Sequence, residues 1–356
     1  MAELKSLLQQ LSSLGVVSAL VAGRRTGLLA ALAAQFPRFV TAAELASLCR
    51  CNARVVLEWC LSLSAVGGVL EWKRDEAGQL AFRCPELLGQ AMTDPTMPFY
   101  LGGLADALLA QVAEPERLAR FIQSGTGFAF PPSFALQMED MHEAFVRHRF
   151  FATVGKSEAG ARLARPGVRV VDIGCCTGQL LRALAQRNPQ GHYTGLDIEE
   201  SFLKQGRAIL QKPEFAEIAP RIILARSAAE ENVFDVVITT DMLHDCTAPE
   251  EVMALAARLL SPEGVYVAAE PRAHETAEAQ LRDPQSLMSY GISLHACLPS
   301  SMARPGGAAL GTLGLARTKL EQLGARAGFR RVLRIPGNTD PFNDYFLLYK
   351  SLAPKL

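Results

Sequence analysis

Two acidic residues and two glycines are spaced so that they could hold a nucleoside. Asp172, Gly174 and Gly178 form D-x-G-x-x-x-G at the end of an apolar run, and Asp197 lies nineteen residues beyond Gly178. Glycines let the backbone approach a ligand closely and place a helix N-terminus against it. An acid at the end of the following strand suits the two hydroxyl groups of a ribose. This order of residues predicts a nucleoside-containing cofactor.

Cys176 lies where a third glycine is expected in this turn. A cysteine is small, and it fits such a turn if its φ angle is negative and its side chain points away from the cofactor. We therefore expect a functional loop, and we expect that Cys176→Gly leaves cofactor binding equal or tighter.

One histidine is well suited to move a proton. His244 lies in TTDMLHDCTAPEEV, just past a predicted strand. A histidine with a pKa near neutrality can take a proton from a hydroxyl, thiol or amine. The alternative is a structural role, in which His244 caps a turn or hydrogen-bonds the cofactor.

The elements that position these residues alternate between strands and helices from Arg169 onward. Near-continuous apolar strands separated by helices predict an α/β fold with a parallel sheet covered on both faces. Ligands of such sheets bind beyond the carboxyl ends of the strands. The segments RRVLRIP and YFLLYK close the pattern as two strands that could pair as an antiparallel hairpin on the sheet edge.

DIGCCTG and the following GLDIEES resemble the motifs of class I S-adenosylmethionine-dependent methyltransferases, which have a Rossmann-like sheet and a terminal hairpin. The resemblance covers residues 165–350. A dinucleotide site is the weaker alternative because the first loop begins with an acid and the chain ends in that hairpin. The resemblance implies S-adenosylmethionine as cofactor, bound by Asp172, Gly174, Cys176, Gly178, Asp197, Ile198, Ser227, Ala228, Thr240 and Asp241.

The LHD segment is similar to the L-H-D-W segment of small-molecule O-methyltransferases. That similarity implies that His244 is the general base and that Glu270, in VAAEP, orients it. The chain departs from the pattern at two positions. Cys246 replaces the tryptophan, and Gly314 lies where a second supporting acid is expected.

The first ninety residues predict a winged helix-turn-helix domain. Helical spacing runs from Val16 to Ala34, Thr41 and Glu44 form a capping box, and Asn52 caps a helix that ends at Gly67 and Gly68. The segments VLEWKRD and GQLAFRC then read as a hairpin.

The predicted recognition helix does not suit DNA. Arg54 is its only cation, Glu58 is a counter-charge, and groove binding needs several polar or basic side chains on one face. We therefore expect packing or homodimerisation through residues 1–90.

Residues 91–160 predict a helical linker or lid, and residues 161–356 the methyltransferase domain. The linker includes a predicted helix, ALQMEDMHEAFVRHRFFA, and the insertion from Arg272 to Gly314 is long enough to act as a lid. Pockets favour domain junctions, so these segments supply the candidate substrate residues, although packing roles are the alternative. The candidates are Met141, His142, Phe145, Tyr290, His295 and Asn343.

Composition excludes several classes of partner. Lys plus Arg and Asp plus Glu both number 36, so no net charge attracts nucleic acid or anionic membrane. The eight cysteines lack the spacing of a zinc site, which predicts no metal and free thiols in a reducing compartment. No apolar run is long enough to span a membrane. We expect a cytoplasmic protein.

The favoured interpretation is methyl transfer from S-adenosylmethionine to the oxygen of a small molecule. A thiol acceptor is the first alternative, because a thiol needs a base less, and an amine follows. An inactive cofactor-binding or winged-helix regulatory protein is the alternative of another class. The N-terminal winged helix, the LHD segment, SLHACLPSSMARPGGAALGTLG and the terminal DPFNDYFLLYK together resemble a largely uncharacterised group of bacterial and animal methyltransferases. That resemblance covers nearly the whole chain and leaves the acceptor open.

Overall fold

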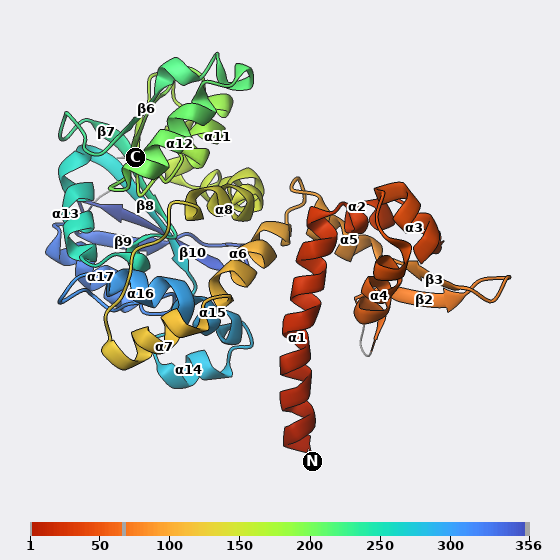
Figure 1. The fold of residues 1–356 in the computed structure, drawn as a ribbon. Coiled ribbons are helices and arrows are strands. Elements are labelled where there is room, and N and C mark those ends of the chain that lie inside the picture. Colours follow the sequence, from red (N-terminus) through yellow and green to blue (C-terminus); the bar gives the residue numbers. More distant parts are fainter. Residues whose placement is uncertain (1, 66–68, 353–356) are drawn as a thin grey trace. The chain divides into compact units, whose positions relative to one another are not determined.

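The computed structural model describes residues 2–65 and 69–352, and the chain divides into two compact units (Figure 1). The first unit comprises Met1–Ala113 and Asp140–Ala144. The second comprises Glu114–Glu139 and Phe145–Leu356. The domain boundaries predicted near residues 90 and 160 remain predictions.

The first unit combines helices with a small antiparallel sheet of order β1-β3-β2. Thr41 accepts a hydrogen bond from the Glu44 amide and Glu44 returns one to the Thr41 amide, so the predicted capping box is confirmed. Asn52 caps the next helix as predicted. The elements are α1 (Ala2–Arg25), α2 (Leu28–Ala33), β1 (Val40–Thr41), α3 (Ala42–Cys49), α4 (Ala53–Ser64), β2 (Glu71–Arg74), β3 (Leu80–Arg83), α5 (Glu86–Thr93) and α6 (Gly102–Val112).

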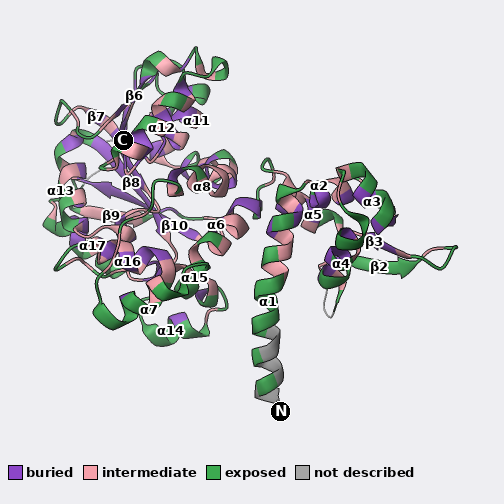
Figure 2. Cartoon of the chain, in the orientation of Figure 1, coloured by how far each residue is buried: buried purple, intermediate pink, exposed green. Residues whose placement is uncertain are grey.

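Helix α4 packs one of its faces against the core of the first unit. Its buried side chains include Trp59 and Leu63, which join the core of this unit. Figure 2 shows that buried segments occur in both units. Arg54 forms an exposed ion pair with Glu58 at 2.6 Å. Gly67 and Gly68, predicted to end this helix, lie outside the described residues. The hairpin β2–β3 is present where predicted, while the winged-helix assignment itself stays a prediction.

The second unit is built on a seven-stranded sheet of order β6-β5-β4-β7-β8-β10-β9. Strands β4 to β8 are parallel, and β10 pairs antiparallel with both β8 and β9. The predicted Rossmann-like α/β fold with a terminal hairpin is therefore confirmed. The strands are β4 (Arg169–Ile173), β5 (His192–Leu196), β6 (Ile222–Ala225), β7 (Phe234–Thr240), β8 (Leu260–Pro271), β9 (Arg331–Arg334) and β10 (Asn343–Tyr349).

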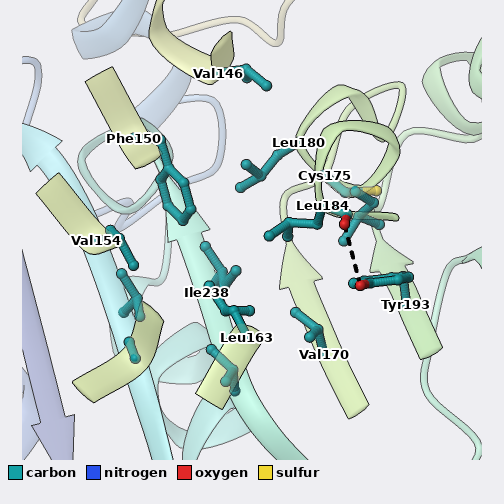
Figure 3. Close-up of a cluster of buried hydrophobic side chains, with 14 of the residues drawn as sticks. Val146, Phe150, Val154, Leu163, Val170, Cys175, Leu180, Leu184, Tyr193 and Ile238 are labelled. Carbon is teal, nitrogen blue, oxygen red and sulfur yellow. Dashed lines mark hydrogen bonds between the residues drawn. The ribbon is translucent and has the colours of Figure 1, made fainter. Parts of the chain in front are cut away.

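Helices cover both faces of this sheet because successive strand residues point to opposite sides. In β4, Val170 faces one core and Val171 the other. Figure 3 shows the first core, in which Phe150 and Leu180 approach the strands. The covering elements are α10 (Glu158–Leu163), α11 (Gln179–Arg187), α12 (Glu200–Leu210), α13 (Pro249–Leu259) and α17 (Arg317–Arg326), with short 3-10 turns η2 (Pro213–Phe215) and η3 (Ala219–Arg221).

The single helix predicted over residues 135–152 is not continuous in the structure. The prediction of one long helix is therefore wrong. Phe145 and Phe150, five residues apart, are both buried against Tyr345, and the wider winding of a π-helix brings both to the core side. The segment contains α7 (Pro115–Ser124), α8 (Phe134–Met141), the π-helix η1 (Phe145–Phe150) and α9 (Phe151–Val154).

The predicted lid insertion is largely helical. Gln280 links it internally, because its amide donates to the carbonyl of Leu313 and its Oε1 accepts from the hydroxyl of Tyr290. Its elements are α14 (Ala277–Arg282), α15 (Ser286–Ile292), the π-helix η5 (Ser293–Cys297) and α16 (Leu298–Ser301). Across the part of the chain that the structure describes, no helix is both long enough and apolar enough to cross a membrane.

Candidate active site

The turn after β4 holds its backbone in the left-handed region at three positions. Gly174 has φ 76°, Cys176 φ 52° and Gly178 φ 77°. The negative φ expected for Cys176 is wrong. A residue with a Cβ atom in this region costs about 1–2 kcal/mol, whereas glycine does not. The cysteine therefore carries backbone strain that the usual glycine would avoid.

Asp197 lies directly after β5 and is held by the same turn. Its Oδ2 accepts a hydrogen bond of 2.9 Å from the amide of Cys176, and its Oδ1 accepts one of 2.9 Å from the amide of Glu199. Burial raises the pKa of Asp197, and these amide hydrogen bonds act against that rise. Cys176 thus orients the acid through its backbone N–H group, which any residue except proline would provide.

Asp172 is buried within β4, and its Oδ1 atom has no hydrogen-bond partner. Burial, with a smaller effect from Asp197, raises the pKa of Asp172 to about 8. A buried carboxyl oxygen without a partner is unfavourable unless a ligand or an ion satisfies it. This site therefore suits a ligand that carries a hydrogen-bond donor or a positive charge.

The other predicted cofactor residues follow the carboxyl ends of the parallel strands. Ile198 is exposed next to Asp197, while Ser227 and Ala228 lie beyond β6. Thr240 ends β7, and Asp241 accepts a hydrogen bond of 2.7 Å from the side chain of Asn343. Because these strands are parallel, their ends meet at one edge of the sheet, which is where ligands of such folds bind.

His244 lies in the 3-10 turn η4 (Leu243–Asp245), directly beyond β7, and Glu270 lies near the end of the neighbouring β8. Nδ1 of His244 is 2.7 Å from Oε2 of Glu270. The backbone amides of Met242, Leu243 and His244 also donate to this carboxylate. Four donors therefore hold Glu270 in place, and the carboxylate fixes the orientation of the imidazole.

The electrostatic surroundings favour the protonated form of His244. Burial by itself would lower the pKa of His244, but the carboxylates of Asp245 and Glu270 and the thiol of Cys297 outweigh it, so the pKa lies well above its ordinary value. Burial also raises the pKa of Asp245 to about 6. A histidine between two carboxylates is a strong proton acceptor once it has lost its own proton.

Cys297, at the end of η5, interacts with both His244 and Asp245. Burial raises the pKa of its thiol to about 11. The sequence marks the residue only as a reactive type within the insertion, 53 positions beyond His244. No spacing signal connects them, because the contact depends on how the insertion folds back over η4.

Sequence reasoning missed a second group, built around Glu139 in α8. Arg182, a buried residue of α11, donates to Glu139 Oε2 at 2.6 Å and to the carbonyl of Thr177 at 2.8 Å. The hydroxyl of Thr177 also donates to Glu139. Thr177 belongs to the turn after β4, so this ion pair braces the predicted cofactor loop from the outside.

The predicted substrate residues are dispersed. Met141 and His142 belong to the first unit, whereas Phe145 is buried in a core of the second. Tyr290 bonds to Gln280. His295 contacts the carbonyl of Gly291 through Nδ1 at 2.9 Å. Asn343 is the exception, because its partner Asp241 lies at the sheet edge. Their roles in substrate binding stay predictions.

A family model described as a methyltransferase domain matches residues 164–322. The second unit therefore contains a stretch that is similar to methyltransferase domains. The match contains the turn after β4, His244, Glu270 and Cys297, whereas Asn343, which donates to Asp241 at the same edge of the sheet, lies outside it.

Solved methyltransferases share the fold. An O-methyltransferase family protein from Burkholderia thailandensis matches with a TM-score of 0.67 and 19% identity, over 98% of both chains. Human N-acetylserotonin methyltransferase, solved in complex with S-adenosylmethionine, matches with a TM-score of 0.63 and 18% identity, over 99% of this chain and 98% of its own. At these identities the likeness shows the fold alone.

Curated relatives match a shorter stretch. A ubiquinone biosynthesis O-methyltransferase of Stutzerimonas stutzeri is 39% identical over 100 residues, which is 28% of this chain and 42% of that protein. A ubiquinone/menaquinone biosynthesis C-methyltransferase of Ruegeria is 30% identical over 102 residues, 28% of this chain and 41% of its own length. The chain thus spans less than half the length of these relatives.

Proposed function

We propose that the protein transfers the methyl group of S-adenosylmethionine to a small-molecule acceptor, with a hydroxyl oxygen favoured as the acceptor atom. The observation that carries this proposal is the His244–Glu270 pair at the same sheet edge as the turn after β4 and Asp197. The solved relatives with this fold include an O-methyltransferase family protein and a methyltransferase in complex with S-adenosylmethionine.

The residues at the sheet edge fit S-adenosylmethionine. Asp197 suits the two ribose hydroxyls, and Gly174 and Gly178 leave the backbone open to close approach. Asp172 has a buried oxygen without a partner, which suits a ligand that carries positive charge. When bound, the cofactor supplies an electrophilic methyl group, so the protein has to align the acceptor and exclude water.

His244 is the group that takes the acceptor's proton in this proposal. Its Nδ1 is committed to Glu270, which leaves Nε2 to accept the proton as the oxygen attacks the methyl carbon. Glu270 then stabilises the imidazolium that forms. A thiol acceptor, the first alternative, would depend less on this step because a thiol ionises nearer to neutral pH.

We also propose that the protein forms a homodimer through its first unit. Leu4, Leu7, Leu11 and Leu14 of α1 are each more than half exposed, and their spacing of three and four residues places them on one helix face. A second copy would cover this stripe. Light scattering after size exclusion tests it: a dimer is expected for the native chain, and a monomer for the variant Leu7→Lys with Leu11→Lys. A monomeric native chain contradicts the proposal.

Calorimetric titration with S-adenosylmethionine and its demethylated product tests the central proposal. We expect binding and a rise in the unfolding temperature. No heat and no thermal shift at millimolar ligand would overturn the enzyme proposal in favour of an inactive protein.

The base is tested separately, with phenols and alkane thiols as acceptor probes and release of the demethylated cofactor as the readout. His244→Ala should lower turnover of hydroxyl acceptors about 10²–10⁴-fold while cofactor binding persists. His192→Ala, at an exposed position where β5 begins, is the matched control. Unchanged turnover in His244→Ala at saturating acceptor would remove this residue from the mechanism.

A further inference from the structure

His244, Asp245 and Cys297 form a cluster of three side chains of metal-ligand type. Each offers one ligand atom, and these atoms all lie within 4.8 Å of one another. They supply an imidazole nitrogen, a carboxylate oxygen and a sulfur. Zinc binds these three donor types at about 2.0–2.3 Å and prefers four ligands in a tetrahedron.

One buried carboxylate oxygen of this cluster lacks a hydrogen bond. Oδ1 of Asp245 lies 3.3 Å from Nε2 of His244, yet it makes no hydrogen bond. A buried polar atom without a partner calls for an explanation, and a bound ion is one. His244 Nε2 and Asp245 Oδ1 thus lie close together without sharing a hydrogen bond, as expected of two atoms that bind one ion.

Glu270 provides the outer support that a metal-binding histidine needs. A histidine that binds a metal usually donates its other ring nitrogen to a carboxylate, which fixes the tautomer and the ring orientation. His244 does so through Nδ1, and three backbone amides hold the carboxylate. Nε2, the nitrogen nearer to Asp245, is therefore the one that can bind an ion.

Charge balance also suits a divalent ion. A neutral imidazole, a carboxylate and a thiolate together carry two negative charges, which one divalent cation neutralises. The ligand side chains of His244 and Cys297 are buried and that of Asp245 is 17% exposed. Neutralisation matters here because an uncompensated charge in such a setting is costly.

We infer that His244, Asp245 and Cys297 bind one zinc-class divalent ion, with a fourth position open to solvent or to an acceptor. This inference goes beyond the proposed function. A bound ion takes the lone pair of Nε2, so protein that holds it cannot use His244 as a base. Metal occupancy therefore suppresses the base-dependent transfer to hydroxyl acceptors.

Cobalt titration tests the site without any turnover. Metal-free full-length protein is titrated with Co²⁺, with absorption spectra recorded at each addition. We expect one equivalent to bind, with the visible bands of tetrahedral cobalt and a near-ultraviolet band from thiolate to cobalt. Zn²⁺ should displace the cobalt and abolish both bands. Absence of these bands in the native chain would overturn the inference.

Matched variants assign the ligands. Cys297→Ser should lose the thiolate band, whereas Cys246→Ser should keep it, because the Cys246 sulfur is directed to the carbonyl of Met242 at 3.2 Å. Glu270→Gln should keep the band but weaken the metal affinity about 10–100-fold. A thiolate band that survives Cys297→Ser would also overturn the assignment. Calorimetry with S-adenosylmethionine shows whether each variant is folded, and failure of cofactor binding in the native chain would count against the proposed function alone.

Discussion

Glu270 accepts a hydrogen bond of 2.7 Å from Nδ1 of His244, and the two residues, which lie near the ends of neighbouring strands, are 26 positions apart in the chain. The carboxylate and the imidazole are both buried. This contact fixes the orientation of the imidazole, leaves Nε2 as the ring nitrogen that Glu270 does not hold, and places a negative charge beside the ring. The same carboxylate holds the η4 turn through three amides, so Glu270 positions both the side chain and the backbone of His244.

Glu270→Gln should therefore lower turnover of hydroxyl acceptors by about 10²-fold, at the lower end of the range for general base catalysis. The amide cannot stabilise an imidazolium, although it keeps the shape of the side chain. Steady-state kinetics against Glu278→Gln, an exposed position in α14, measure the effect. A change in KM alone, with kcat preserved, would contradict the orienting role.

Cys176→Gly should stabilise the protein by about 1 kcal/mol, because glycine adopts the left-handed backbone at φ 52° without strain. Cofactor affinity should be equal or tighter, since the amide that holds Asp197 remains. Urea unfolding and calorimetry provide the two measurements. Cys176→Val is the opposing variant and should lose stability, because a β-branched side chain tolerates this backbone poorly. If the glycine variant failed to bind the cofactor, the thiol itself would have a role in the site.

Asp197→Ala should weaken S-adenosylmethionine binding by roughly 10–100-fold, which corresponds to the loss of about 1.5–3 kcal/mol for a hydrogen bond to a charged group. The carboxylate is placed by two backbone amides that remain in the variant. Calorimetric titration gives the dissociation constant. The same titration with a 2′-deoxy analogue should show little difference between the native chain and the variant, and an equal loss for both ligands would argue against a ribose contact.

Asp172 predicts a pH-dependent stability. Its pKa is raised to about 8 in the folded protein, against an ordinary value of 3.8, mainly by burial. Between these two values the folded state holds a proton that the unfolded state has lost. The free energy of unfolding should therefore fall as pH rises through this window, by at most about 1.4 kcal/mol per pH unit.

Asp172→Asn mimics the protonated acid and should remove this contribution to the slope. Urea unfolding of both proteins at about pH 6 and about pH 8 measures it. Parallel pH profiles for the native chain and the variant would show that Asp172 is already ionised in the folded state.

Much of the architecture follows from local patterns in the sequence. Apolar strands such as β4 and β7 alternate with amphipathic helices, and this pattern determines a parallel sheet because only such a sheet buries both strand faces. Short-range signals were also sufficient for the caps at Thr41 and Asn52, since a cap and its partner amides lie within three residues. The spacing of Gly174, Gly178 and Asp197 predicted the cofactor edge because a glycine-rich turn, a helix and an acid after the next strand follow one another in this order.

What the sequence determined by itself is thus the order of the strands and helices of the sheet, together with a prediction of the sheet edge where the cofactor binds. Only the tertiary structure decided that Cys297 reaches His244 and that Arg182 pairs with Glu139, because these contacts depend on how segments 53 and 43 residues apart fold back on one another. It also decided the sign of φ at Cys176, which the turn as a whole imposes against the preference of the residue. Local propensity contributes about 1 kcal/mol at such a position, and the packing of the surrounding strands and helices outweighs it.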